Sequence, residues 1–222
     1  MNQDRTDELT ALSDMPTQGS PAVLFLHGRG ANEESAALFG EVFPGVSVIA
    51  PRGPLREGAG YAWFRNHSPG IADERSLAEQ IPLLESWIDA DTIPQQSVWL
   101  CGYSNGAAMA ASLLLSRPHR YRGAMLLSGP LVANRPWPAG RLTDIPVLFS
   151  WGDQDRLIPT QLMADSAEYL RGPSGAIASI ARTSGGHEMS MHTLETTRTW
   201  FAHHARMGVL QPPGALSHSE CR

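Results

Sequence analysis

The stretch "CGYSNG", residues 101–106, decides the fold. It follows the apolar run Val98-Trp99-Leu100, which predicts a buried strand, and it precedes an apolar segment of helical character. A serine between two glycines on a tight strand-to-helix turn fits the G-x-S-x-G pattern. Such a turn lifts the Ser104 side chain above the sheet, and the following helix directs its N–H groups toward a negative oxygen there. An ordinary turn with a serine N-cap fits the same letters, so a reaction centre needs partners elsewhere.

Outward from this turn, apolar runs alternate with helical patterns. Strands that are apolar on both faces and separated by helices predict a single-domain α/β fold, with a mostly parallel sheet covered by helices on both faces. The strands are expected at 22–26, 46–50, 97–101, 123–128, 146–152 and 176–181, and the helices near 33–39, 74–89, 105–116, 161–171 and 191–206. Residues 51–70 are expected to form a loop. Pro82 should kink its helix or mark the first turn of a shorter one.

The length of 222 residues suits one domain with a sizeable core. We expect a loose polar leader over residues 1–20, with at most one short edge strand, then the folded domain over 21–206 and a flexible tail over 207–222. The loop 129–144 is the only sizeable candidate for a lid, so no large lid is expected.

Composition and charge argue against several classes of protein. The net charge is −5 with acids and bases mixed along the chain, which gives no support for nucleic acid or a membrane as a partner. The N-terminus has no apolar region of the signal-peptide kind, and the longest apolar stretch, 107–115, is far below the ~20 residues that span a bilayer. The two cysteines, Cys101 and Cys221, predict neither a disulfide nor a metal site. The plain interpretation is a cytoplasmic protein without metal or cofactor.

Serine is a weak nucleophile and needs a base, and the base needs an orienting carboxylate. In an open parallel sheet these groups gather at the carboxyl ends of the strands. Downstream, "WGDQDRLIP" (151–159) and "GGHEMS" (185–190) each follow a strand, in the order Ser, Asp, His that this kind of turn requires. His187 follows two glycines in such a loop and is the predicted base. His192 opens a helix, and the other downstream histidines fall on helix ends, the surface or the tail.

Two aspartates compete for the role of the orienting acid. Asp153 directly follows the strand and its glycine, where it could simply cap the turn. Asp155 lies further into the loop, ahead of Leu157-Ile158-Pro159, where a side chain can reach across to the next loop. The sequence favours Asp155.

A hydrolytic site also needs donors for the oxyanion. One is the backbone N–H of Asn105, the residue after the nucleophile. The second should come from the glycine-rich loop after the first core strand, "LHGRGAN" (26–32).

Taken together, these motifs resemble the α/β-hydrolase superfamily, and within it the phospholipase/carboxylesterase group that includes acyl-protein thioesterase-like enzymes. The resemblance covers roughly residues 20–206 and rests on "LHGRG", "APRGP" with "AWF", "GYSNG", "GDQDRLIP" and "GGHEMS", all in the family's order. It implies Ser104 as nucleophile, Asp155 as acid and His187 as base. It also implies main-chain oxyanion donors at Arg29 and Asn105.

The resemblance further implies a substrate pocket. The pair Trp63-Phe64 matches a stretch that borders the acyl pocket in relatives, and His27 and Tyr103 are expected beside it. Two positions depart from the family pattern: Asn105 stands where many relatives carry Gln, and Arg29 stands where an apolar or small residue is common.

The expected function is that of a cofactor-free serine carboxylesterase acting on short- to medium-chain soluble esters through an acyl-enzyme. One alternative is a thioesterase or a dienelactone-like hydrolase, with Arg29 and Arg65 receiving an anionic substrate; the other reading of both arginines is that they are merely solvated. A second alternative, a non-catalytic binding protein on this fold, should lack a triad member. The expected partner is a small-molecule ester, and a homodimer stays open.

Overall fold

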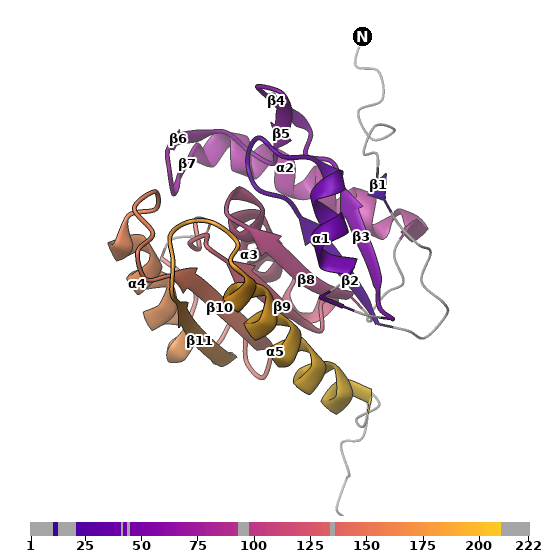
Figure 1. The fold of residues 1–222 in the computed structure, drawn as a ribbon, viewed down its shortest axis with the longest axis vertical. Coiled ribbons are helices and arrows are strands. Elements are labelled where there is room, and N and C mark those ends of the chain that lie inside the picture. Colours follow the sequence, from indigo (N-terminus) through magenta and orange to yellow (C-terminus); the bar gives the residue numbers. More distant parts are fainter. Residues whose placement is uncertain are drawn as a thin grey trace, which may run out of the picture.

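The computed structural model describes residues 11–12, 21–40, 42–43, 45–92, 98–133 and 136–209. A seven-stranded sheet in the order β1-β3-β2-β8-β9-β10-β11 forms its centre (Figure 1). Every neighbouring pair in this sheet is parallel except β1 with β3. The strands are β1 (Ala11–Leu12), β2 (Ala22–Leu26), β3 (Ser47–Pro51), β8 (Val98–Tyr103), β9 (Gly123–Leu127), β10 (Pro146–Gly152) and β11 (Ile177–Thr183).

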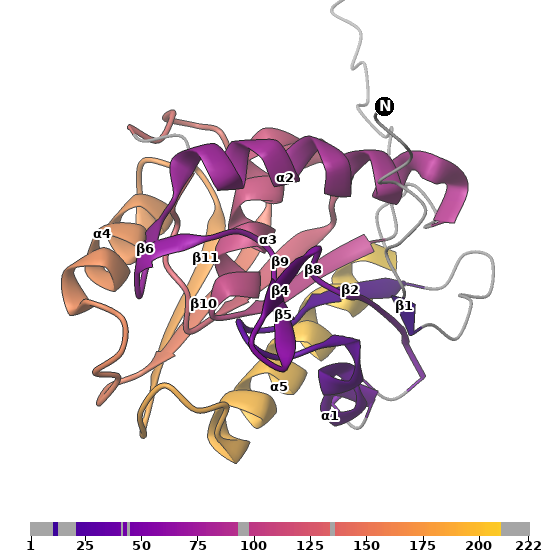
Figure 2. The same cartoon turned by 90° about the horizontal axis from the view of Figure 1, so that it is seen from above.

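Helices cover both faces of this sheet. They are α1 (Ala37–Gly40), α2 (Glu74–Trp87), α3 (Asn105–Ser116), α4 (Thr160–Arg171) and α5 (Met191–Val209). Figure 2 shows α2 above the sheet, and α1 and α5 on the opposite side. A short 3₁₀ helix precedes α1, a π-helical turn follows α2, and a second 3₁₀ helix follows α3.

Successive residues of the central strands enter two separate cores, as the two-residue period of a strand requires. In β2, Leu24 packs into the core under α2, α3 and α4, whereas Phe25 packs into the core under α1 and α5. Leu100 and Cys101 of β8 divide in the same way. Because both faces are buried, these strands carry apolar residues at nearly every position, which is the pattern that the sequence shows.

The predicted fold class, the mostly parallel sheet and the covering of both faces are confirmed. The stretch 51–70 is not simply a loop, since it contains two small antiparallel hairpins. Their strands are β4 (Leu55–Glu57), β5 (Gly60–Ala62), β6 (Asn66–Ser68) and β7 (Ile71–Ala72). Both hairpins lie beyond the carboxyl ends of the central strands, where they frame the site.

The structure decides between the two expectations for Pro82. Of the two expectations for Pro82, the shorter helix is wrong, because α2 runs unbroken from Glu74 to Trp87. Pro82 removes the hydrogen bond to the carbonyl of Ala78, and both residues are exposed, so water can hydrogen-bond that carbonyl.

At the ends of the domain, Ala11–Leu12 is the short edge strand of the leader, and α5 extends to Val209. The rest of the leader and the tail from 210 onward lie outside the described residues. Among the described helices, none is both long and apolar enough to span a bilayer.

Candidate active site

Ser104 is the single residue between the end of β8 and the start of α3. Its backbone has φ 55° and ψ −116°, a conformation that is strained for a residue with a side chain. Its N–H donates to the carbonyl of Leu127 at 2.8 Å, which anchors the turn to β9. The Ser104 side chain makes no capping hydrogen bond to α3, so it is not an ordinary N-cap.

The two glycines of the turn are required by close backbone contacts. A Cβ atom on Gly106 would lie 2.0 Å from the carbonyl oxygen of Leu26, and one on Gly102 would lie 2.3 Å from the carbonyl oxygen of Gly106. Any larger residue would therefore push α3 away from the sheet and move Ser104.

A continuous chain of hydrogen bonds links three of the predicted residues. The Nε2 atom of His187 lies 2.9 Å from Oγ of Ser104, and its Nδ1 atom lies 2.7 Å from Oδ2 of Asp155. The side chain of Asp155 is 3% exposed and that of His187 is 19% exposed. A carboxylate on Nδ1 holds the proton there and leaves Nε2 free to accept the proton of the serine hydroxyl.

The structure distinguishes the two competing aspartates. The second oxygen of Asp155, Oδ1, accepts the N–H groups of Leu157 at 2.8 Å and Ile158 at 3.1 Å, so its orientation is fixed. Asp153 is exposed, and its Oδ1 accepts a long hydrogen bond of 3.3 Å from the N–H of Gly185. Asp155 is thus the one that contacts His187, as the sequence favours.

Tyr103 holds the loop that carries His187. Its hydroxyl donates a hydrogen bond to the carbonyl of His187, and the two rings lie with centroids 5.5 Å apart. Burial, with the nearby charge of Asp155, raises the pKa of Tyr103 to about 12. The hydroxyl therefore stays protonated at neutral pH and keeps this contact.

The loop after β2 is arranged by the buried ring of His27. Its Nε2 atom accepts the N–H of Gly53 at 2.9 Å, so Nδ1 carries the proton and donates to the carbonyl of Gly28 at 2.8 Å. In a trans peptide the N–H of Arg29 points opposite to that carbonyl. This bond therefore fixes the direction of the Arg29 N–H, and Arg29 lines the cavity whereas His27 does not.

The side chain of Asn105 holds the backbone of Trp63 and Phe64 in place. Its Oδ1 accepts the N–H of Trp63 at 2.8 Å, and its amide donates to the carbonyl of Phe64 at 3.4 Å.

The main-chain N–H groups of Arg29 and Asn105 are the two predicted oxyanion donors. Among the loop and cap hydrogen bonds between backbone groups of the described residues, none uses either of them. Neither N–H group therefore has a backbone partner in this set.

Burial lowers the pKa of His27 below its usual value near 6.5. The unfolded chain therefore binds more protons than the folded protein once the pH falls below about 6.5, and the free energy of unfolding should decrease there. His27→Gln removes this titration and should lessen the loss of stability between pH 7 and pH 5. Urea unfolding at both pH values measures the difference, and an equal loss in both proteins would contradict it.

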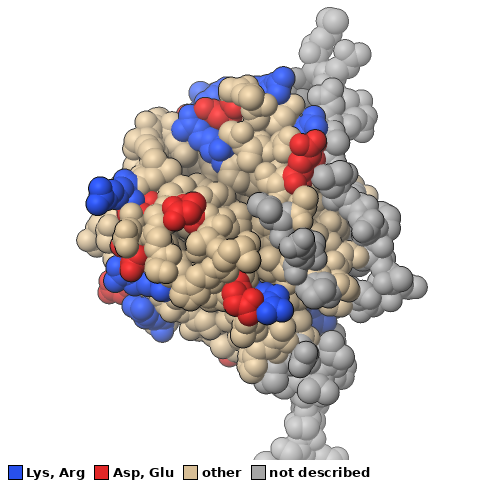
Figure 3. All heavy atoms as spheres, viewed as in Figure 1, with Lys and Arg blue, Asp and Glu red and all other residues tan. Residues whose placement is uncertain are grey.

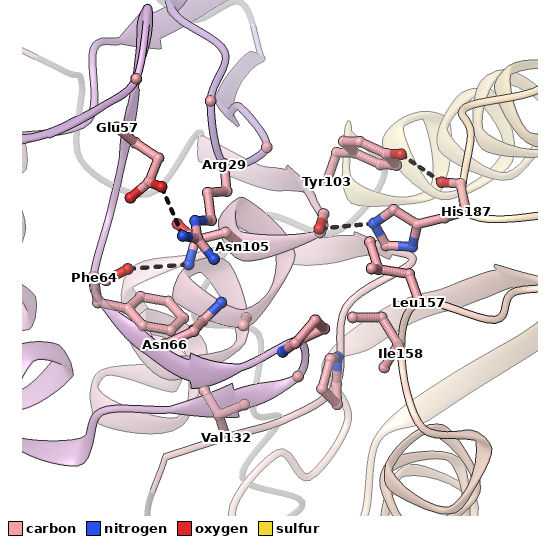
Figure 4. A pocket seen from close by; sticks show the side chains of 18 of the residues that line it. Arg29, Glu57, Phe64, Asn66, Tyr103, Asn105, Val132, Leu157, Ile158 and His187 are labelled. Atoms are coloured by element: carbon pink, nitrogen blue, oxygen red, sulfur yellow. Dashed lines mark hydrogen bonds and ion pairs between the residues drawn. The ribbon is translucent and has the colours of Figure 1, made fainter.

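A cavity of about 610 Å³ opens beside Ser104 and His187 (Figure 4). Its wall is mostly apolar, with Arg29, Glu57 and Asn66 among its polar members. The apolar side chains are those of Ala59, Phe64, Pro69, Ala108, Pro130, Val132, Leu157 and Ile158. In Figure 4, Arg29 and Glu57 meet at the left of the cavity, and His187, Leu157 and Ile158 lie at the right.

Of the four expected pocket residues, Phe64 and Tyr103 line this cavity. His27 and Trp63 do not; each is 1% exposed and lies behind the wall, where the Trp63 indole donates to the His27 carbonyl at 2.9 Å. Arg65 is exposed and is not part of the wall either. Leu157 and Ile158 line the wall from within the quoted motif "GDQDRLIP", but Glu57 and Asn66 lie on the short hairpins at positions outside every quoted motif.

Chemically, the site can activate a serine, protonate a leaving group and stabilise an oxyanion. Within the described residues, no group of three or more His, Cys, Asp or Glu side chains is placed to hold a metal ion. On the face shown in Figure 3, acidic and basic side chains stand close to one another between wide uncharged areas.

Comparisons with known proteins agree with this geometry. The model of the family described as Phospholipase/Carboxylesterase matches residues 12–205. The protein MhqD of Bacillus subtilis is 33% identical over 184 residues, which cover 81% of this chain and 91% of that protein. Acyl-protein thioesterase 1 of Schizosaccharomyces pombe is 28% identical over 166 residues, covering 67% and 74%. The crystal structure of the Bacillus cereus carboxylesterase matches with a TM-score of 0.79 and 25% identity, covering 89% of this chain and 95% of that one.

Proposed function

The chain belongs to the phospholipase/carboxylesterase family and is a hydrolase of carboxylic esters, and from this premise we propose that it hydrolyses short- to medium-chain soluble esters through a serine acyl-enzyme. The observation that carries the proposal is the hydrogen-bonded chain from Asp155 through His187 to Ser104. Three side chains from loops after three different strands meet there within hydrogen-bonding distance.

In the proposed mechanism, Oγ of Ser104 attacks the ester carbonyl while Nε2 of His187 takes the hydroxyl proton. The negative charge of Asp155 stabilises the imidazolium that forms. The carbonyl oxygen becomes an oxyanion that accepts the N–H groups of Arg29 and Asn105. When the carbon–oxygen bond to the alcohol breaks, His187 returns its proton to the leaving oxygen, and the acyl group stays on Ser104.

Water completes the cycle by the same route. His187 takes one proton from the water as its oxygen attacks the acyl carbon, and the second tetrahedral intermediate uses the same two N–H donors. Its collapse returns the proton to Oγ of Ser104 and releases the carboxylic acid. No cofactor takes part in either half of the proposed reaction.

The cavity supports the choice of substrate size. Its volume of about 610 Å³ is within the range of sites for small molecules, and apolar side chains suit an acyl chain of moderate length. A thioester can use the same three residues, and one of the relatives is an acyl-protein thioesterase, so the thioester is the second candidate.

Hydrolysis rates for p-nitrophenyl acetate, butyrate, octanoate and palmitate, measured beside butyryl-CoA, test this proposal. We expect kcat/KM to peak at butyrate or octanoate, to fall steeply at palmitate and to be lower for the thioester. The cavity limits the acyl length and therefore predicts the fall. A maximum at palmitate, or a clear preference for butyryl-CoA, would contradict the proposed substrate class.

A further inference from the structure

An ion pair stands at the mouth of the cavity. Nη2 of Arg29 lies 2.6 Å from Oε1 of Glu57, and both residues line the wall (Figure 4). The side chains are 46% and 38% exposed. The main chain of Arg29 is also one of the two proposed oxyanion donors, and Ser104 lines the same cavity as the ion pair.

The backbones that carry the two side chains are fastened to each other. The N–H of Gly30 donates to the carbonyl of Tyr61 at 2.8 Å, and the N–H of Tyr61 donates to the carbonyl of Ala31 at 2.8 Å. A Cβ atom on Gly60 would lie 2.1 Å from the carbonyl oxygen of Gly30, so the hairpin packs closely on the loop. Exposed ion pairs usually contribute little because both side chains must be ordered. Here the backbone contacts hold the two attachment points within reach of each other.

The other charged side chains named here do not replace Glu57 as the partner of Arg29. Among the described residues of the wall, Arg29 and Glu57 are the only two that carry a formal charge with His187 neutral. Arg56, which adjoins Glu57, lies over the Tyr61 ring at 4.9 Å from its centroid. Glu188 is exposed beside His187 and adds a negative charge on the other side of the site.

We propose that Glu57 is a specificity-determining residue, which neutralises Arg29 and restricts the site to uncharged esters. This inference rests on the proposed esterase function and names its substrate class. A carboxylate on the substrate must displace Glu57 from Arg29 while Glu57 itself repels it. The apolar side chains of the wall offer that carboxylate no donor, and the amide of Asn66 can donate a hydrogen bond but carries no charge. An uncharged ester meets neither cost.

Two matched pairs of esters test the charge on either side of the scissile bond. On the acyl side, p-nitrophenyl hexanoate is compared with mono-p-nitrophenyl adipate, and on the alcohol side, phenyl acetate is compared with 4-acetoxybenzoate. The quantity measured is the ratio of kcat/KM for the anionic ester to that for its neutral partner. The proteins are the wild type, Glu57→Gln, Arg29→Met and the double variant. Glu195→Gln is the control, because it removes the acid of another exposed acid–arginine pair, with Arg198, on α5.

The wild type should favour the neutral ester in both pairs. Glu57→Gln should raise the ratio about tenfold or more in at least one pair, because it frees Arg29 for a charge-assisted contact. The double variant should lose that gain, and Glu195→Gln should keep the ratio of the wild type.

An unchanged ratio in Glu57→Gln would overturn the inference while leaving the esterase function intact. A wild type that prefers the anionic esters, with Arg29→Met removing that preference, would overturn it too and would make Arg29 an anion receptor. A wild type that hydrolyses none of the four esters and does not react with a fluorophosphonate would overturn the proposed function and this inference with it.

Discussion

Ser104→Ala is expected to lower kcat for p-nitrophenyl butyrate by about 10⁴-fold or more. The variant has no oxygen to attack the carbonyl, and the two proposed oxyanion donors alone cannot form the acyl-enzyme. Alanine and serine share the same Cβ, so the backbone at φ 55° gains no extra strain and the fold should be kept. Steady-state kinetics measures the loss, and circular dichroism with thermal unfolding checks the fold.

Ser128→Ala is the matched control. Ser128 also has a positive φ, 53°, and follows β9, the neighbour of β8 in the sheet, but it is not among the described residues that line the cavity. It should keep kcat within a few-fold of the wild type. Comparable losses in the two variants would mean that the strained turn, and not the Ser104 hydroxyl, supports activity.

Asp155→Asn is expected to lower kcat by about 10⁴-fold, the cost typical of replacing the acid of such a triad with its amide. The amide cannot stabilise the imidazolium. Its NH₂ group also disfavours the proton on Nδ1 of His187, so Nε2 no longer accepts the serine proton. The N–H groups of Leu157 and Ile158 can still donate to the amide oxygen, which should preserve the loop.

Asp153→Asn, two residues away, controls for the loss of a charge in the same loop. Asp153 is exposed, and an asparagine oxygen can keep its long contact with the N–H of Gly185. Its kcat should fall less than threefold. Should Asp153→Asn prove the more damaging of the two, the orienting carboxylate has been assigned to the wrong residue.

The core of the site was predictable because its chemistry leaves short local patterns. A serine between glycines at a strand end, and an acid and a histidine after later strands, are visible wherever the strands are recognised. In a parallel sheet, all these loops must emerge at the same edge. The hydrogen bonds of His187 to Ser104 and Asp155 follow from that constraint and not from any single motif.

The part of the cavity wall that the two hairpins form was not predictable in the same way. The strands of the two hairpins are two or three residues long, too short for a period of two to stand out from a loop. The ion pair between Arg29 and Glu57 joins residues 28 positions apart through the bridge between Ala31 and Tyr61, which has no local sequence signal. The order of strands in the sheet is likewise set by packing between distant segments.

His27 and Trp63 illustrate how proximity along the chain misleads. Both adjoin residues of the wall, yet each is turned into the core, where polar ring atoms need partners. His27 finds them in Gly28 and Gly53, and Trp63 finds one in the His27 carbonyl. These two residues therefore hold the loop after β2 from the core side, and Phe64 lines the cavity instead.

The central claim is that Ser104 carries the acyl group, and covalent labelling tests it most directly. The wild type is treated with a fluorophosphonate until activity falls, and the modified residue is located by fragment-ion mass spectrometry. We predict one label per chain, on Ser104, with activity lost in proportion to labelling and with no label on Ser104→Ala. A label on another residue, or full activity in protein labelled at Ser104, would contradict the account.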